Sequence, residues 1–88
     1  MDVILEKAKQ GDRASQVIMW SELMNQVPRD YEEIEHWLEK ASAQGDTDSI
    51  INLIELLEKK LKHISHVSTA AKTIKKKIQD YKKILTSI

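Results

Sequence analysis

The sequence predicts an all-α fold of about five helices: antiparallel helical hairpins that form about one and a half repeats, followed by a C-terminal capping helix. The 88 residues include only two Gly, one Pro and no Phe, and the common Ile, Leu, Lys, Glu, Ala and Gln favour helix over strand. The tripeptide Gln10-Gly11-Asp12 recurs 34 residues later as Gln44-Gly45-Asp46, a spacing typical of helical-hairpin repeats. Apolar residues recur at helical intervals between these turns.

Two helices are expected before Pro28, one from about Asp2 to Gln10 and one from Asp12 to about Gln26. Gly11 suits the left-handed residue that follows a helix, and Asp12 suits an N-cap whose carboxylate accepts backbone N–H bonds. The apolar set of the second helix is Val17, Ile18, Met19, Trp20, Leu23 and Met24.

A third helix is expected between the break at Val27-Pro28-Arg29 and Gly45. Asp30, with Glu33 three residues later, resembles a capping box, so Asp30 is the predicted N-cap. The predicted buried stripe is Tyr31, Ile34, Trp37, Leu38 and Ala41.

The fourth helix is expected to open at Asp46 and to lie in the middle of the bundle, because its apolar set is too broad for a surface helix. That set is Ile50, Ile51, Leu53, Ile54, Leu56, Leu57, Leu61 and Ile64.

The fifth helix is expected to start at the N-cap Ser68 and to run nearly to the C-terminus. It carries one narrow apolar seam, which we expect to dock on the fourth helix as a cap: Val67, Ala71, Ile74, Ile78, Tyr81, Leu85 and Ile88. Residues 1–88 then form one domain, with a repeat-like part at 1–64 and a basic amphipathic helix at 65–88.

Two segments resemble the Sel-one-like repeat, a relative of the tetratricopeptide repeat, and the resemblance covers roughly residues 4–60. They are Val27-Pro28-Arg29-Asp30-Tyr31 and Trp37-Leu38-Glu39-Lys40-Ala41-Ser42-Ala43-Gln44-Gly45-Asp46. Trp20 and Ile54 stand where that family usually has a small residue. The resemblance implies a protein-binding scaffold or adaptor without catalytic activity.

Several classes of function are excluded or disfavoured by what the sequence lacks. Without cysteine there is no disulfide, no Cys-ligated zinc and no thiol nucleophile. His63 and His66 lie three residues apart, but no third ligand has a recognisable position, so we expect no metal and no cofactor. No nucleophile–base arrangement and no phosphate-binding loop is present, so we expect no enzyme. The absence of a signal-peptide pattern or a long apolar stretch predicts a cytoplasmic protein that does not span a membrane.

The charges are divided unevenly: residues 1–45 carry nine acidic and five basic side chains, and residues 46–88 carry five acidic and nine basic ones. The C-terminal lysines are expected to form a solvated face, to pair with an acidic partner, or to pair with the acidic third helix of another copy. A nucleic-acid or anionic-surface role is disfavoured, because Arg and interleaved aromatic residues are scarce there.

Together these observations predict a small module that binds one partner protein, such as an adaptor, an inhibitor or an immunity-type factor. One alternative is a self-assembling protein, such as a homodimer, in which the fifth helix pairs with that of a second copy. Another alternative is a nucleic-acid or anionic-surface binder that uses the C-terminal lysines. Trp20 has two interpretations, a core residue or an anchor for the partner. The candidate partner-binding residues are Trp20, Glu32, Glu35, Lys72, Lys76 and Lys83.

Overall fold

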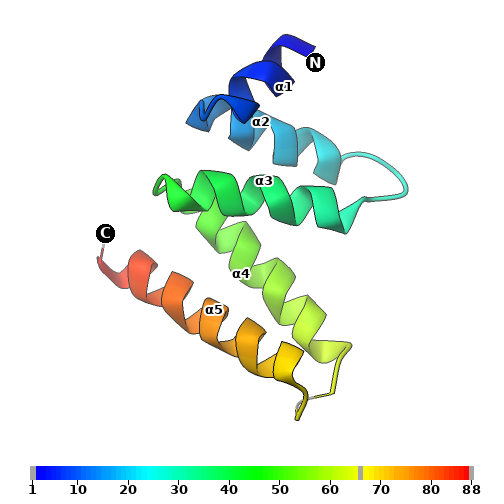
Figure 1. Ribbon diagram of the computed structural model, residues 1–88, viewed down its shortest axis with the longest axis vertical. Coiled ribbons are helices and arrows are strands. Elements are labelled where there is room, and N and C mark those ends of the chain that lie inside the picture. Colours follow the sequence, from blue (N-terminus) through cyan, green and yellow to red (C-terminus); the bar gives the residue numbers. More distant parts are fainter. Residues whose placement is uncertain (1, 66, 88) are drawn as a thin grey trace.

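Five helices make up the fold in the computed structural model, which describes residues 2–65 and 67–87 (Figure 1). They are α1 (Asp2–Lys9), α2 (Arg13–Met24), α3 (Tyr31–Ala43), α4 (Thr47–Lys62) and α5 (Thr69–Ser87). The described residues contain no strand, so the predicted all-α class with about five helices is confirmed. The second helix ends two residues earlier than expected, at Met24 rather than Gln26.

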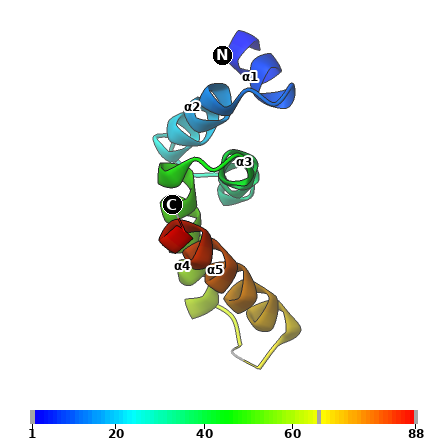
Figure 2. The ribbon, with the colours of Figure 1, turned by 90° about the vertical axis from the view of Figure 1, so that its left-hand side faces the viewer.

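The helices pack in chain order, α1 on α2, α2 on α3, α3 on α4 and α4 on α5. Helices α2 and α3 run antiparallel, as do α4 and α5, and α1 and α5 lie at the two ends of the array (Figure 1). The molecule is flat, measuring 42 × 34 × 18 Å, and the edge-on view shows α5 beside α4 (Figure 2). The fourth helix lies between α3 and α5, which confirms its predicted interior position.

The turns before α2 and α4 have the same backbone conformation. Gly11 and Gly45 have φ angles of 103° and 83°, in the left-handed region that favours glycine. Asp12 and Asp46 are extended N-caps with nearly equal angles, φ −70° and ψ 113° against φ −70° and ψ 112°. Each carboxylate accepts the backbone N–H three residues on, at 2.9 and 3.0 Å. The predicted roles of all four residues are confirmed.

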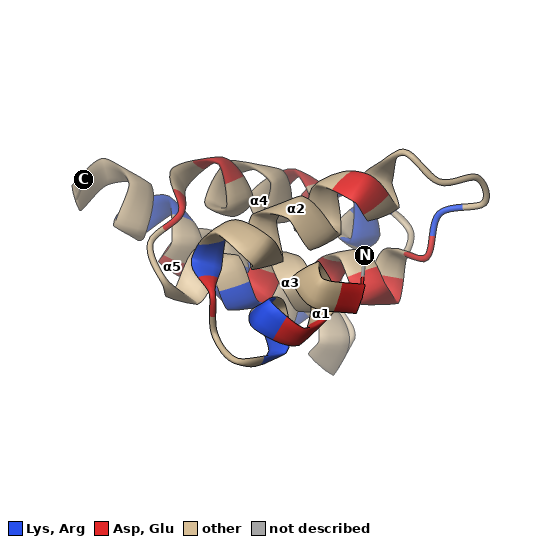
Figure 3. Ribbon diagram, turned by 90° about the horizontal axis from the view of Figure 1, so that it is seen from above, with Lys and Arg blue, Asp and Glu red and all other residues tan. Residues whose placement is uncertain are grey.

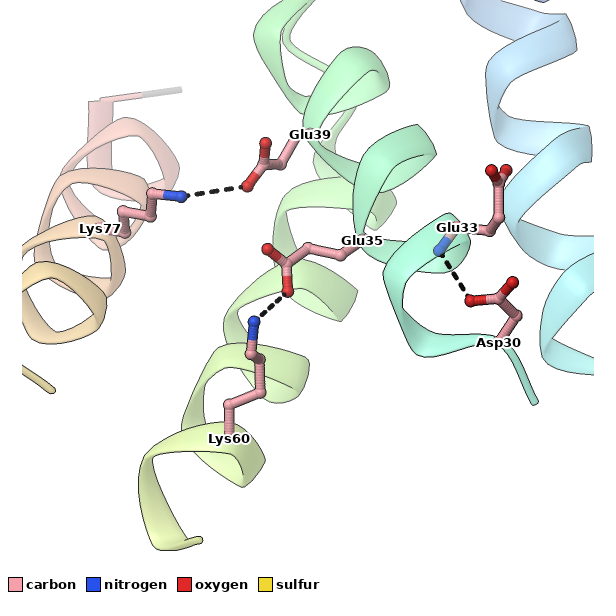
Figure 4. Close-up of polar contacts among 6 residues, drawn as sticks. All are labelled: Asp30, Glu33, Glu35, Glu39, Lys60 and Lys77. Carbon is pink, nitrogen blue, oxygen red and sulfur yellow. Dashed lines mark hydrogen bonds and ion pairs between the residues drawn. The ribbon is translucent and has the colours of Figure 1, made fainter. Parts of the chain in front are cut away.

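Two further N-caps were expected at Asp30 and Ser68. The Asp30 carboxylate accepts a hydrogen bond from the Glu33 backbone N–H at 3.2 Å and so starts α3 (Figure 4). The Ser68 hydroxyl oxygen accepts the Ala71 N–H at 3.1 Å and starts α5. Both predictions are confirmed.

The apolar core consists of two clusters that meet at Trp20 and Leu23, which pack against both. The larger cluster joins α3, α4 and α5 and comprises Ile34, Leu38, Ile50, Leu53, Ile54, Leu56, Leu57 and Ile78. The smaller one joins α1, α2 and α3 through Ala8, Met19 and Trp37. Of the α5 seam, Ala71 is fully buried, and Ile74, Tyr81 and Leu85 pack against the larger cluster. The seam therefore docks on the rest of the chain as predicted.

Several residues expected in the core are exposed instead. Tyr31 is 49% exposed because it is the first residue of α3, at the open end of the helix. Ile18 and Ile51 are exposed because α2 packs mainly on α1 and α3, and α4 mainly on α3 and α5. Each of these helices therefore has one face that no other helix covers. Val67 is 84% exposed because it precedes α5 and lies in the turn. Ile88, the last residue of the predicted seam, lies outside the described residues.

Candidate partner-binding surface

Trp20, a candidate anchor in the sequence, lies at the junction between the two core clusters. Its indole Nε1–H donates to the Ser49 hydroxyl at 2.9 Å, and that hydroxyl donates in turn to the Asp46 carboxylate at 2.6 Å. Ser49 is fully buried. The polar atom of Trp20 is therefore used inside the fold, which favours the core interpretation over the anchor.

The corresponding turn before α2 has the same serine without the tryptophan. The Ser15 hydroxyl donates to the Asp12 carboxylate at 2.5 Å, alongside the backbone bond described above. The side-chain bond from Ser15, followed by the backbone bond from the same residue, lowers the pKa of Asp12 below 3.8, because both bonds stabilise the ionised carboxylate. The serine of the turn before α4 thus has a bond that the serine of the turn before α2 lacks, the one from Trp20.

The acidic face of α3 is largely engaged within the chain. Lys60 of α4 pairs with Glu35 at 2.8 Å, and Lys77 of α5 pairs with Glu39 at 3.3 Å (Figure 4). Pairing of these acids with lysines of another copy was one of the alternatives from the sequence, and the structure shows that two of the acids meet lysines of their own chain. The reason is that docking of α5 brings Lys77 beside α3. Such surface pairs contribute only about 0–1 kcal/mol each.

The other charged candidates lie on two different helices, α3 and α5. Lys72, Lys76 and Lys83 are exposed on α5, and none of the ion pairs within residues 2–65 and 67–87 includes them. Glu32 is exposed in the first turn of α3, where acidic residues follow the loop from α2 (Figure 3). The structure therefore brings Glu32 and Glu35 together, and it leaves the lysines on a separate helix.

A groove of about 360 Å³, here called the α3–α4 groove, runs between the start of α3 and the end of α4. Its lining residues are Tyr31, Glu32, Glu35, Leu56, Lys59, Lys60 and His63. Leu56 is a buried apolar residue in this lining, and Tyr31 is half-exposed. The acids come from α3, and the two lysines and His63 come from α4 and its C-cap. A hollow of about 30 Å³ shares Tyr31, Leu56 and Lys59 with the groove.

Two of the candidates named from the sequence, Glu32 and Glu35, line this groove, and Tyr31, Lys59 and Lys60, which also line it, were not among the candidates. Tyr31 fits the helical period of the buried stripe, and for that reason it was assigned to the core. Its position directly after the N-cap Asp30 is the signal that it lies at an uncovered helix end.

The described residues contain neither a metal-binding cluster nor a membrane-spanning helix. There, no three His, Asp or Glu side chains come close enough together to hold a metal ion, and His66 lies outside these residues. No helix among them combines the length and apolar character needed to cross a membrane.

Comparison with known proteins adds no relative: no family model, no curated protein and no solved structure matches the chain. The resemblance to the Sel-one-like repeat stays a hypothesis that rests on the sequence motifs.

Proposed function

We propose that this protein is a cytoplasmic protein–protein interaction module, without catalytic activity, that binds one partner protein through the α3–α4 groove. The observation that carries the proposal is Tyr31, a half-exposed aromatic side chain that lines a groove together with the buried Leu56. Partly exposed tyrosines in apolar pockets are frequent energetic centres of protein interfaces, because they bury a large ring while the hydroxyl stays hydrogen-bonded.

The charges around the groove indicate the kind of segment that fits it. Glu32 carries negative charge on the α3 side and Lys59 carries positive charge on the α4 side, and neither forms an ion pair within the described residues. A short amphipathic helix places an apolar side chain in such a groove and charges of both signs along its edges. The Sel-one-like resemblance implies the same role, that of a protein-binding scaffold or adaptor.

A second candidate function uses the basic face of α5. Lys72, Lys76 and Lys83 are exposed and without ion pairs in the described part, so this face is available to nucleic acid or to an anionic surface. The coiled-coil alternative has less support, because the α5 seam packs against the larger core cluster of the same chain.

Affinity capture from the native host, with paired surface variants, tests the proposal. The variants are Tyr31→Ala in the groove and, as the matched control, the triple change Lys72→Glu, Lys76→Glu, Lys83→Glu on α5. All four residues are exposed, so the folded state should change by less than about 0.5 kcal/mol per site, and thermal melts verify this. We expect one protein to be captured by the wild type and the α5 variant and to be lost with Tyr31→Ala. The reverse pattern would transfer the function to the basic face.

A further inference from the structure

A second pocket, the α1–α3 pocket, lies between the end of α1 with its Gly11 turn and the second half of α3. It measures about 480 Å³. Its lining contains no Asp or Glu and consists of Ala8, Lys9, Gln10, Gly11, Gln16, His36, Trp37, Lys40 and Gln44. With neutral histidine the lining carries two positive charges, in contrast to the mixed charges of the α3–α4 groove.

The walls of this pocket are held together by two glutamines. Gln16 is buried, and its side-chain amide donates to the Ala8 carbonyl at 3.0 Å. The Gln44 side-chain amide donates both to the Gln16 side-chain oxygen and to the Gly11 carbonyl, each at 2.8 Å. The end of α1 and the end of α3 are therefore joined before any ligand arrives, which lowers the conformational cost of binding.

One lining residue has an unmet hydrogen bond. Trp37 is only 4% exposed, and its indole Nε1–H has no acceptor within the described residues. Buried donors are satisfied in the great majority of cases, and an unsatisfied one costs about 1–3 kcal/mol. The other tryptophan, Trp20, follows the rule through its bond to Ser49. Trp37 also lines the pocket, and an acceptor group that reached this N–H would remove the penalty.

The side chains around Trp37 define the charge of that acceptor. Lys9 and Lys40 are exposed and form no ion pair within residues 2–65 and 67–87. His36 packs edge-to-face on Trp37, with 4.7 Å between ring centroids. The two lysines favour an anion, whereas the C-terminal ends of α1 and α3, which also border the pocket, oppose any anion and oppose a doubly charged one more strongly. A carboxylate, with one negative charge, fits better than a phosphate.

We propose that the α1–α3 pocket binds a carboxylate side chain of an acidic peptide segment. In this proposal the indole N–H of Trp37 is the donor to the carboxylate, and Lys9 and Lys40, which line the same pocket, supply the positive charge. This site is separate from the α3–α4 groove, and the inference does not depend on the function proposed for that groove.

The two tryptophans provide a direct readout by nuclear magnetic resonance. Their indole N–H signals in the intact protein are assigned with Trp20→Phe, and the protein is titrated with a blocked oligoglutamate peptide. Oligoglutamine is the neutral control, and inorganic phosphate at equal ionic strength is the third probe. We expect a saturable shift of the Trp37 signal with oligoglutamate alone and a much smaller change at Trp20.

Surface variants locate the binding site independently of Trp37. The double variant Lys9→Gln, Lys40→Gln should weaken oligoglutamate binding about tenfold, since it removes two partly screened ion pairs. The matched control Lys72→Gln, Lys76→Gln on α5 should bind as the wild type does. The proposal would be overturned if the Lys9/Lys40 variant bound oligoglutamate as tightly as the wild type. It would also be overturned if oligoglutamine shifted the Trp37 signal as oligoglutamate does, or if phosphate gave a saturable shift. Trp37→Phe tests the donor directly, and the lysine variants remain decisive if it fails to fold.

Discussion

The repeated turn makes it possible to measure the bond between Trp20 and Ser49 by comparing two serine-to-alanine variants. Ser15→Ala removes one hydroxyl bond, that to Asp12, while Ser49→Ala removes the bond to Asp46 and also the acceptor of Trp20. Alanine keeps the backbone N–H, so both N-cap bonds survive. The two sites are also alike in being buried.

The expected magnitudes follow from these bonds. Loss of the hydroxyl–carboxylate bond lowers the free energy of unfolding by about 1 kcal/mol in either variant. Leaving the Trp20 N–H without an acceptor costs about 1–3 kcal/mol when the donor is fully buried, and Trp20 is partly exposed, so the lower limit applies. Ser49→Ala should therefore be destabilised by about 1 kcal/mol more than Ser15→Ala.

Urea denaturation followed by circular dichroism gives both free energies, and a double-mutant cycle isolates the bond. Trp20→Phe removes the N–H donor and keeps a ring. Combined with Ser49→Ala it should show a coupling of about 1 kcal/mol, whereas with Ser15→Ala the effects should add to within about 0.5 kcal/mol. Equal losses in the two serine variants, together with zero coupling, would refute the assignment of Trp20 as a structural junction.

Three further predictions concern a turn, the C-terminal helix and a titrating group. Gly45→Val should lower the free energy of unfolding by more than about 1 kcal/mol, because a β-branched residue is strained at a φ of 83°. No atom lies within 4 Å of a new Cβ, so the cost comes from backbone strain alone. Gly45→Asn should cost less, and equal urea midpoints for both variants and the wild type would contradict this. Truncation after Ile64 should expose the larger core cluster and give aggregation or dye binding, whereas a truncated chain that unfolds cooperatively would refute the cap. Burial, followed by the charge of Glu39, raises the pKa of Tyr81 above 10.0, so its contribution to stability is complete below pH 10 and is lost as the pH rises through the folded value. Comparison of the wild type with Tyr81→Phe in a spectrophotometric titration measures this, and a Tyr81 titration at its ordinary value would disprove it.

The turns were predictable from sequence because their causes are local. A left-handed Gly45 followed by the N-cap Asp46 depends on residues within one helical turn, and the same holds for Gly11 and Asp12. The docking of α5 was predictable as well, since a broad apolar set on the fourth helix needs a cover. Periodicity therefore identified the helices, the interior position of the fourth and the docking of the fifth upon it.

The exposure of some apolar residues could not be predicted from helical periodicity. Helical period assigns Tyr31 and Ile51 to apolar faces, but it does not say how far a neighbouring helix extends over each face. The α3–α4 groove exists because no helix covers the start of α3, a property of the assembled fold. The bonds that hold the α1–α3 pocket join residues 28 and 33 positions apart, at Gln44–Gln16 and Gln44–Gly11, and no local pattern indicates them.

Packing in chain order also has a kinetic consequence. Because each helix contacts chiefly the next one along the chain, most contacts are local, and folding should be fast, in the microsecond-to-millisecond range typical of helical proteins of low contact order. The same arrangement makes the opening energies uneven. Helix α1 has eight residues and packs on α2, so its amides should exchange with solvent first. Helix α4 supplies five of the eight buried residues of the larger core cluster, so its amides should exchange last. A carboxylate bound between α1 and α3 would slow exchange in α1 selectively, and occupancy of that pocket would then register as protection of the first helix.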